Sequence, residues 1–262
     1  MNTLRIALAQ TTHPKDGDAA GLVARVCEQA AQERCELVVF PESLMTPYEK
    51  DKGAFLKEAE PIDGPFSQSV CATAKRLGLW AAYTVNELNP NGHPFNTAVI
   101  ADSAGEICGS YRKTHLFDTD FTKESDRMAQ GDALFTPIDS PWGKIGLGIC
   151  YDLRFPEVAR KQALEGATLL LYPAAWVAGD LKIEQWETLI RARALENELF
   201  VAGVSRADEG YIGHSCIADP RGTIAARAGA GDELLIADLD FSLIDCVRSA
   251  MPVFDHRRPS LY

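Results

Sequence analysis

Residues 146–157 read GLGICYDLRFPE, and the rest of the chain is arranged around them. The apolar run from Lys144 to Ile149 predicts a buried strand, and the residues from Pro156 onward predict a helix. Cys150 therefore stands between a strand end and a helix start, where unpaired backbone N–H groups favour a thiolate. Free cysteines are also among the most buried residue types, so an inert buried thiol is the alternative.

The composition predicts one α/β domain covering residues 1–262. The chain is 46% hydrophobic and 24% charged, within the range of a single large globular domain. Its 37 acidic and 26 basic side chains give a net charge of −11. This charge argues against nucleic acid and anionic membrane as partners, because both require a basic surface. The most apolar stretch, residues 167–179, contains Pro173 and is too short to span a bilayer.

The cysteines and the N-terminus favour a cytoplasmic location. Seven cysteines, an odd number without any CxxC pair, fit neither a disulfide framework nor a structural zinc site. Residues 1–10 lack the basic and long apolar segments of a signal peptide. The five histidines are scattered without metal-ligand spacing, and His115 is interpreted as structural. We therefore expect no metal and no cofactor.

The order of the predicted elements favours two sheets packed together, with helices on the outer faces. Helical spacing covers residues 18–34, 66–77, 156–165, 183–197 and 241–248. Apolar runs predict strands at residues 4–9, 37–40, 79–88, 95–101, 107–112, 134–137, 144–149, 168–172, 200–205, 215–218, 223–226 and 234–239.

Three reactive side chains come at or just after the ends of predicted strands: Glu42, Lys113 and Cys150. A carboxylate can act as general base, a thiol as nucleophile, and an ammonium as oxyanion stabiliser. Taken singly, the two charged side chains are explained as solvated loop residues. All three are needed by one mechanism and occupy comparable positions, so together they favour a catalytic site.

The motifs around these residues resemble the three signature motifs of the nitrilase superfamily of carbon–nitrogen hydrolases. They read FPE at residues 40–42, YRKTHLF at 111–117 and GICYDLRFPE at 148–157. The resemblance covers the whole chain and implies an α-β-β-α four-layer sandwich with a Glu42–Lys113–Cys150 triad. The family also carries a second glutamate between the Lys and Cys motifs, for which Glu124 is the match.

The resemblance further implies amide hydrolysis through a cysteine thioester. Glu42 would take the proton of Cys150, while Lys113 and the backbone N–H of Tyr151 would hold the developing oxyanion. Glu124 would orient Lys113 or assist proton transfer. A non-catalytic interaction protein on this fold would be indicated by a missing triad member, and none is missing.

Within the superfamily the chain is most similar to the ω-amidase group, which acts on dicarboxylate monoamides such as 2-oxoglutaramate. Arg154 is expected to bind the substrate carboxylate, with a salt bridge to Asp152 or Glu157 as the alternative. Trp176 and Tyr48 are expected to wall the pocket. Trp-Val at residues 176–177 departs from the Phe-Asn of related ω-amidases, so a deaminated glutathione amidase or an N-carbamoyl amine amidohydrolase stays open.

The resemblance also implies a homodimer. In the family, subunits pair through the helices near Cys150 and at residues 183–197. The C-terminal tail, about residues 249–262, is expected to pack on the partner subunit.

Overall fold

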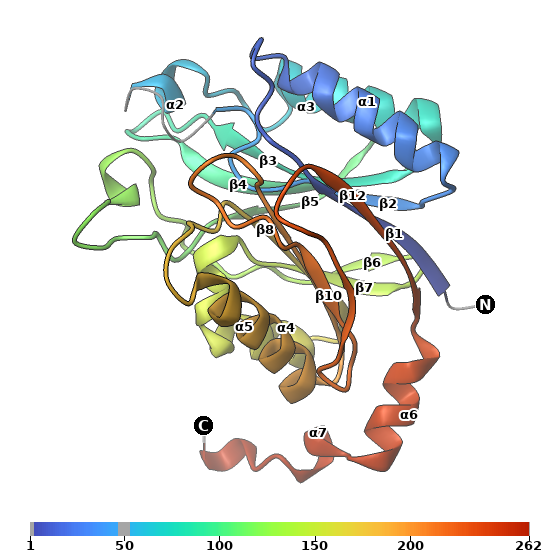
Figure 1. The fold of residues 1–262 in the computed structure, drawn as a ribbon. Coiled ribbons are helices and arrows are strands. Elements are labelled where there is room, and N and C mark those ends of the chain that lie inside the picture. The colour runs from blue at the N-terminus through green and yellow to red at the C-terminus, as the bar shows by residue number, and fades with distance from the viewer. Residues whose placement is uncertain (1–2, 47–52, 262) are drawn as a thin grey trace.

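Two six-stranded sheets face each other, and helices cover the outer face of each (Figure 1). The computed structural model describes residues 3–46 and 53–261. The strand order is β12-β1-β2-β3-β4-β5 in the first sheet and β11-β10-β9-β8-β7-β6 in the second. The predicted α-β-β-α sandwich of two mixed sheets is confirmed.

The first sheet brings the ends of two chemically important strands to one edge. Its strands are β1 (Thr3–Gln10), β2 (Leu37–Val39), β3 (Trp80–Glu87), β4 (Phe95–Ala101), β5 (Ile107–Arg112) and β12 (Glu233–Asp240). β1, β2 and β3 are parallel, whereas β3–β4, β4–β5 and β1–β12 pair antiparallel. Because two antiparallel steps restore the direction, β2 and β5 end at the same edge.

The second sheet has a parallel centre of β7, β8 and β9. Its strands are β6 (Ile138–Ser140), β7 (Gly143–Leu147), β8 (Ala167–Ala174), β9 (Phe200–Ser205), β10 (Cys216–Ala218) and β11 (Ile224–Arg227). The strand predicted at residues 134–137 is wrong, since the ladder begins only at Ile138. Pro137 has no N–H to donate to a ladder, which explains why pairing starts after it.

The first sheet is covered by α1 (Ala19–Gln32) and α3 (Pro65–Leu77). The Asp18 carboxylate caps α1 by accepting a 2.8 Å hydrogen bond from the Gly21 N–H. Gly78 ends α3 with φ +67°, a left-handed conformation that glycine adopts without steric cost. The buried faces of both helices pack with the first sheet in one hydrophobic cluster.

The second sheet is covered by α4 (Pro156–Leu164) and α5 (Lys182–Asn197). The buried face of α5 carries Trp186, Ile190 and Ala194. These side chains belong to the same hydrophobic cluster as residues between the two sheets, among them Leu8 of β1 and Leu171 of β8. The main core therefore continues from the first sheet through the second to its helices.

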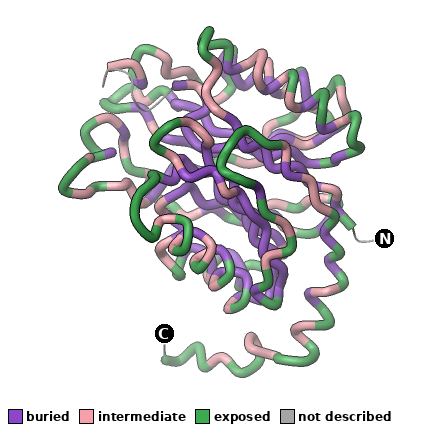
Figure 2. Tube along the Cα trace, in the orientation of Figure 1, coloured by how far each residue is buried: buried purple, intermediate pink, exposed green. Residues whose placement is uncertain are grey.

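The C-terminal segment leaves the sheets and runs along the bottom of the molecule (Figure 1). It contains α6 (Ser242–Ala250), α7 (Val253–His256) and a 3₁₀ turn at Pro259–Leu261. Most of it is exposed or half-buried (Figure 2). The remaining helical elements are α2 (Ala54–Lys57) and two 3₁₀ turns, η1 (Glu124–Asp126) and η2 (Cys150–Arg154). None of the helices in the described part of the chain is long and apolar enough to cross a membrane.

Candidate active site

Strand ends from both sheets bring the predicted residues to one pocket. Glu42 and Cys150 lie three residues past β2 and β7, and Lys113 directly follows β5. All three line a pocket of about 300 Å³ together with Glu124, Phe117, Ala175 and Tyr211. The carboxyl ends of strands are the usual location of sites in α/β sheets. The structure thus brings together all four residues that were predicted to carry the chemistry.

Glu42 is held on both carboxylate oxygens. Its Oε1 accepts hydrogen bonds from Lys113 Nζ at 2.8 Å and Asn96 Nδ2 at 2.7 Å. Its Oε2 accepts one from the Ala175 N–H at 2.8 Å. The residue is 4% exposed. These contacts fix the orientation of a buried carboxylate beside the Cys150 thiol.

Glu124 comes from the loop that follows β5 and faces Lys113 from the other side. Lys113 Nζ donates to Glu124 Oε1 at 3.0 Å and to Oε2 at 2.8 Å. The Phe117 N–H donates to Oε2 at 2.7 Å, and Asn96 Nδ2 lies 3.3 Å from Oε1. The segment after β5 therefore folds inward at η1 and places a buried carboxyl group beside Lys113.

One buried ammonium thus lies between two carboxyl groups. Burial alone would lower the pKa of Lys113, but Glu124 and Glu42 raise it well above its ordinary value. Burial raises the pKa of Glu42, yet Lys113, the Ala175 N–H and Cys150 outweigh burial and leave it lowered. For Glu124, burial and the Glu42 charge outweigh Lys113, so its pKa is raised. Lys113 is therefore charged at neutral pH. Of the two glutamates, Glu42 has the lower pKa and Glu124 the higher.

Cys150 is the first residue of η2 and stands at a strained turn after β7. Its φ of +47° lies in the left-handed region, which costs energy for a residue other than glycine. Burial raises the pKa of its thiol well above the ordinary value, and the Glu42 carboxylate raises it further. Burial and the Glu42 charge therefore disfavour the thiolate that the position at a helix start favours, and the Lys113 ammonium opposes them only in part.

Asp152 braces the turn that carries Cys150. It is fully buried, and its Oδ2 accepts hydrogen bonds from the Ile149 N–H at 2.8 Å and the Tyr111 hydroxyl at 2.9 Å. Its Oδ1 lies 2.7 Å from His115 Nδ1 and accepts the His115 N–H at 3.2 Å. The His115 ring stacks on Phe155 at 3.8 Å between centroids. His115 thus has a packing and hydrogen-bonding role.

Asp152→Asn is expected to lower the free energy of unfolding by about 1–3 kcal/mol, because an amide NH₂ would face donors that now meet a carboxylate. The kcat should fall as the Cys150 turn loses its support. Urea denaturation of both proteins measures the first effect. Asp139→Asn is the control, since that side chain is 90% exposed, and equal stability of Asp152→Asn and wild type would contradict the bracing role.

Arg206 supports the backbone beside Glu42. Its side chain is buried, and Nη1 donates to the Ser43 carbonyl at 2.6 Å while Nε donates to Asp208 at 2.7 Å. Ser43 has a φ of +56°, so it is a second residue other than glycine in the left-handed region. Arg206 therefore stabilises a strained turn immediately after the carboxylate.

A second pocket, of about 250 Å³, adjoins the first, because Phe117 and Cys150 line both. Its other lining residues are Tyr151, Arg154, Trp176, Val177 and Lys182. The predicted wall residue Trp176 is thus at the pocket, as are Tyr151 and Arg154. The other predicted wall residue, Tyr48, lies outside the described residues.

Arg154 has neutral partners. Its Nη2 donates to Gln185 Oε1 at 2.8 Å, and its guanidinium carbon lies 4.9 Å from the centroid of the Trp176 ring. The alternative of a salt bridge to Asp152 or Glu157 finds no support among the contacts of the described residues. Within residues 3–46 and 53–261, Arg154 is therefore a cation at the pocket without a neutralising carboxylate.

Sequence reasoning missed four contributors to the site. Asn96, Lys182 and Tyr211 carry no motif that separates them from ordinary polar residues, and Asp152 lies within GICYDLRFPE but was considered only as a partner of Arg154. Asn96 offered the clearest signal, as an amide at the start of the apolar strand FNTAVIA. A buried amide of this kind needs partners, and its partners here are the two glutamates.

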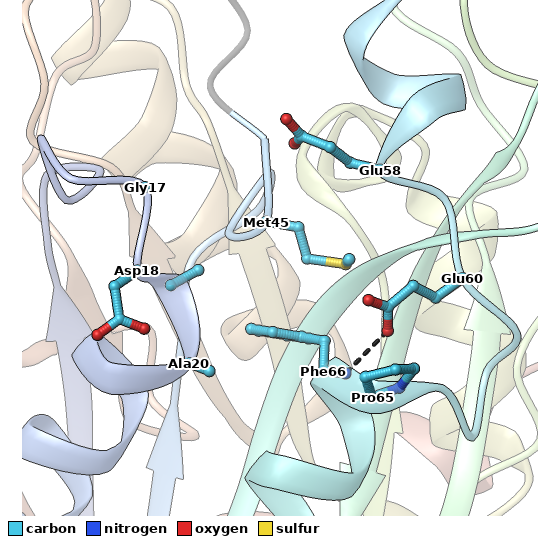
Figure 3. Close-up of a pocket in the computed structure, with 9 residues that line it drawn as sticks. Gly17, Asp18, Ala20, Met45, Glu58, Glu60, Pro65 and Phe66 are labelled. Carbon is cyan, nitrogen blue, oxygen red and sulfur yellow. Dashed lines mark hydrogen bonds between the residues drawn. The ribbon is translucent and has the colours of Figure 1, made fainter.

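A larger pocket of about 750 Å³ lies elsewhere on the molecule (Figure 3). It is lined by Gly17, Asp18, Ala19, Ala20, Met45, Glu58, Glu60, Pro65 and Phe66. Its carboxylates bind nearby groups of the chain: Glu60 accepts from the Phe66 N–H at 2.8 Å, and the Thr46 hydroxyl donates to Glu58. These lining residues contain no nucleophile, which sets this pocket apart from the one at Cys150.

Comparisons with known proteins show the family to which the chain belongs. The family model for carbon–nitrogen hydrolases matches residues 5–249. The omega-amidase NIT3 of Saccharomyces cerevisiae is 35% identical over 99% of this chain and 94% of its own length. The deaminated glutathione amidase of Mus musculus is 33% identical over 98% of this chain and 84% of its own length. The crystal structure of S. cerevisiae Nit3, a member of the nitrilase superfamily, superposes with a TM-score of 0.86 at 33% identity, covering 98% of this chain and 97% of that one. The chain therefore belongs to the carbon–nitrogen hydrolase family of the nitrilase superfamily.

Proposed function

We propose that this hydrolase is an ω-amidase, which cleaves the amide of a short dicarboxylate monoamide such as 2-oxoglutaramate and releases ammonia. The observation that carries the proposal is the buried Glu42–Lys113–Glu124 cluster beside Cys150, together with Arg154 in the adjoining pocket, which pairs with no carboxylate of the described residues. The first set of residues supplies the chemistry, and the second supplies a binding group for an anionic substrate.

In the first half-reaction Glu42 takes the thiol proton as Cys150 Sγ attacks the amide carbon. A thiol with a raised pKa next to an ionised carboxylate fits such general base catalysis better than a preformed thiolate. The developing oxyanion would lie between Lys113 Nζ and the Tyr151 N–H, and one such donor typically lowers the barrier by about 3 kcal/mol.

Collapse of the tetrahedral intermediate breaks the C–N bond. The proton held by Glu42 passes to the leaving nitrogen, so ammonia departs and a thioester remains on Cys150. Glu42 then takes a proton from the water that attacks the thioester, and Cys150 recovers a proton when the carboxylic acid leaves. Glu124 holds the Lys113 ammonium in place through both steps.

Arg154 is proposed to bind the substrate carboxylate. A guanidinium offers two parallel donors that match a carboxylate, and its stacking on Trp176 keeps the plane fixed. Trp176 itself is buried, which suits a wall that excludes water from the acyl chain.

Arg154→Gln is expected to lower kcat/KM for 2-oxoglutaramate by about 10- to 100-fold, mainly through KM, because hydrogen bonds to a charged group are lost. Measuring ammonia release at varied concentrations of 2-oxoglutaramate gives kcat and KM for both proteins. Arg160→Gln on α4 is the matched control and should have little effect. An unchanged KM in Arg154→Gln would contradict the proposed contact.

A substrate panel separates this proposal from the relatives' other activities. The similarity to a deaminated glutathione amidase keeps that reaction as a second candidate. Hydrolysis of deaminated glutathione releases a dipeptide as the amine product, whereas hydrolysis of an ω-amidase substrate releases ammonia. The products should therefore be identified by mass spectrometry. The panel compares 2-oxoglutaramate, succinamate, deaminated glutathione and an N-carbamoyl amine. A clear preference for either of the last two would reject the ω-amidase assignment.

We also propose a homodimer in a reducing compartment such as the cytoplasm. The exposed C-terminal segment, in which Met251 is 62% and Leu261 61% exposed, supports association with a second copy. All seven cysteines are unpaired, including the exposed Cys246, which supports a reducing environment. Light scattering on the purified protein tests the dimer.

A further inference from the structure

We propose that Lys182 is a second cation of the acyl-binding pocket and that it selects amides whose acyl chain ends in an anionic group. The inference rests on the proposed amidase function and adds a specificity-determining residue to it. Lys182 would act together with Arg154 on one terminal carboxylate of the substrate.

Lys182 is placed at the pocket by the start of α5. It is the first residue of the helix and follows Leu181, whose φ of +57° turns the chain sharply. Its ammonium lies 5.9 Å from the centroid of the Phe117 ring, and Phe117 lines both pockets at Cys150. The lysine side chain is therefore directed toward the site of the reaction.

Trp176 links the two cations. Its ring lies under the Arg154 guanidinium at 4.9 Å, and its Nε1 donates a 3.1 Å hydrogen bond to the Lys182 carbonyl. Because one rigid and buried side chain contacts both residues, their positions relative to each other are constrained. Arg154 supplies paired donors with a fixed direction, whereas Lys182 supplies a mobile point charge.

The charge balance favours an anionic ligand. Among the described residues no carboxylate lies within ion-pair distance of Arg154 or Lys182, although acidic side chains outnumber basic ones by 37 to 26. Cations elsewhere on the surface do find partners, as Arg112 does with Glu87 and Arg227 with Glu187. Two cations at one apolar pocket, neither paired with a carboxylate of the described residues, create a positive potential that the apolar walls strengthen.

The dimensions of the pocket restrict the ligand to a short chain. The space bounded by Cys150, Arg154 and Lys182 has a volume of about 250 Å³. A small molecule that places a reactive amide at Cys150 can therefore also place a carboxylate at the two cations. A monoamide of a short dicarboxylic acid has both groups, whereas a neutral amide lacks the second.

The test compares Lys182→Met with wild type on two substrates of the same size, succinamate and the uncharged succinamide. We expect kcat/KM for succinamate to fall about 10-fold, as for the loss of one contact to a charged group, and kcat/KM for succinamide to stay within about 2-fold. Lys75→Met is the matched control, because it removes one exposed lysine from α3. It should leave both values unchanged.

An equal loss on both substrates, or no loss on either, would overturn the role of Lys182 and leave the amidase proposal standing. If wild type hydrolysed neither substrate, the amidase proposal would fail, and succinate binding would then test the pocket separately. In calorimetric titration, wild type should bind succinate about 10-fold more tightly than Lys182→Met. Equal affinities would overturn the inference.

Discussion

Replacing Cys150 by alanine is expected to abolish amide hydrolysis and leave the fold intact. Without the thiol no thioester can form, and removal of a nucleophile costs at least about 10⁴-fold in kcat. The exchange removes only one buried sulfur atom, and alanine meets the same positive φ that cysteine already adopts. Steady-state ammonia release and a thermal melt of both proteins measure the two effects.

Cys246→Ala provides the control, because Cys246 is exposed on α6, far along the chain from the pocket residues. It should retain full activity. Glu42→Gln should resemble Cys150→Ala in activity, since a neutral amide cannot accept the thiol proton. Substantial turnover by Cys150→Ala with a normal melting curve would refute the assignment of the nucleophile.

Lys113→Met is expected to abolish activity and also to destabilise the protein by about 3–5 kcal/mol at neutral pH. The substitution leaves Glu42 and Glu124 buried without the ammonium that neutralises them, and breaking a buried ion pair on one side typically has this cost. Chemical denaturation of both proteins gives the difference. Lys161→Met is the control, because its partner Glu165 is on the surface and exposed pairs contribute less than about 1 kcal/mol.

The stability deficit of Lys113→Met should shrink as the pH falls. In wild type the pKa of Glu42 is lowered, so its stabilising effect is present above its unfolded value and is lost as pH falls through the folded value. The raised pKa of Lys113 keeps its contribution intact over the same acidic range. In the variant both carboxyl groups have no counterion, so the folded state gains protons first and is stabilised by acid. A deficit that stayed constant between pH 8 and pH 5 would contradict this electrostatic account.

The layers of the fold were predictable because apolar periodicity marks strands and helices that are buried on one or both faces. The strand at residues 134–137 was misplaced, because a short apolar run does not reveal which backbone groups can pair. Because Pro137 has no N–H to donate, strand pairing begins at Ile138. The C-terminal helix was expected at residues 241–248 and was found at Ser242–Ala250.

The main site residues were predictable for a topological reason. Parallel strands deliver their carboxyl ends to one edge, so Glu42 and Lys113 at strand ends were expected to lie near each other. The ionisation of Cys150 was not predictable, because it depends on burial and on the distance to Glu42. Asn96, Asp152 and Lys182 were missed for a related reason: each gains its importance from partners far away in the sequence.

The division of the pocket between two sheets has a mechanical consequence. The base and the ammonium follow strands of the first sheet, whereas the nucleophile follows β7 of the second. Asp152, at the nucleophile turn, is hydrogen-bonded to Tyr111 of β5 and to His115 just beyond it, so it ties the two halves together. The rate of the reaction therefore depends on the position of one sheet relative to the other. A substitution between the sheets that shifts one sheet relative to the other is therefore expected to lower kcat, even where it is remote from any substrate atom.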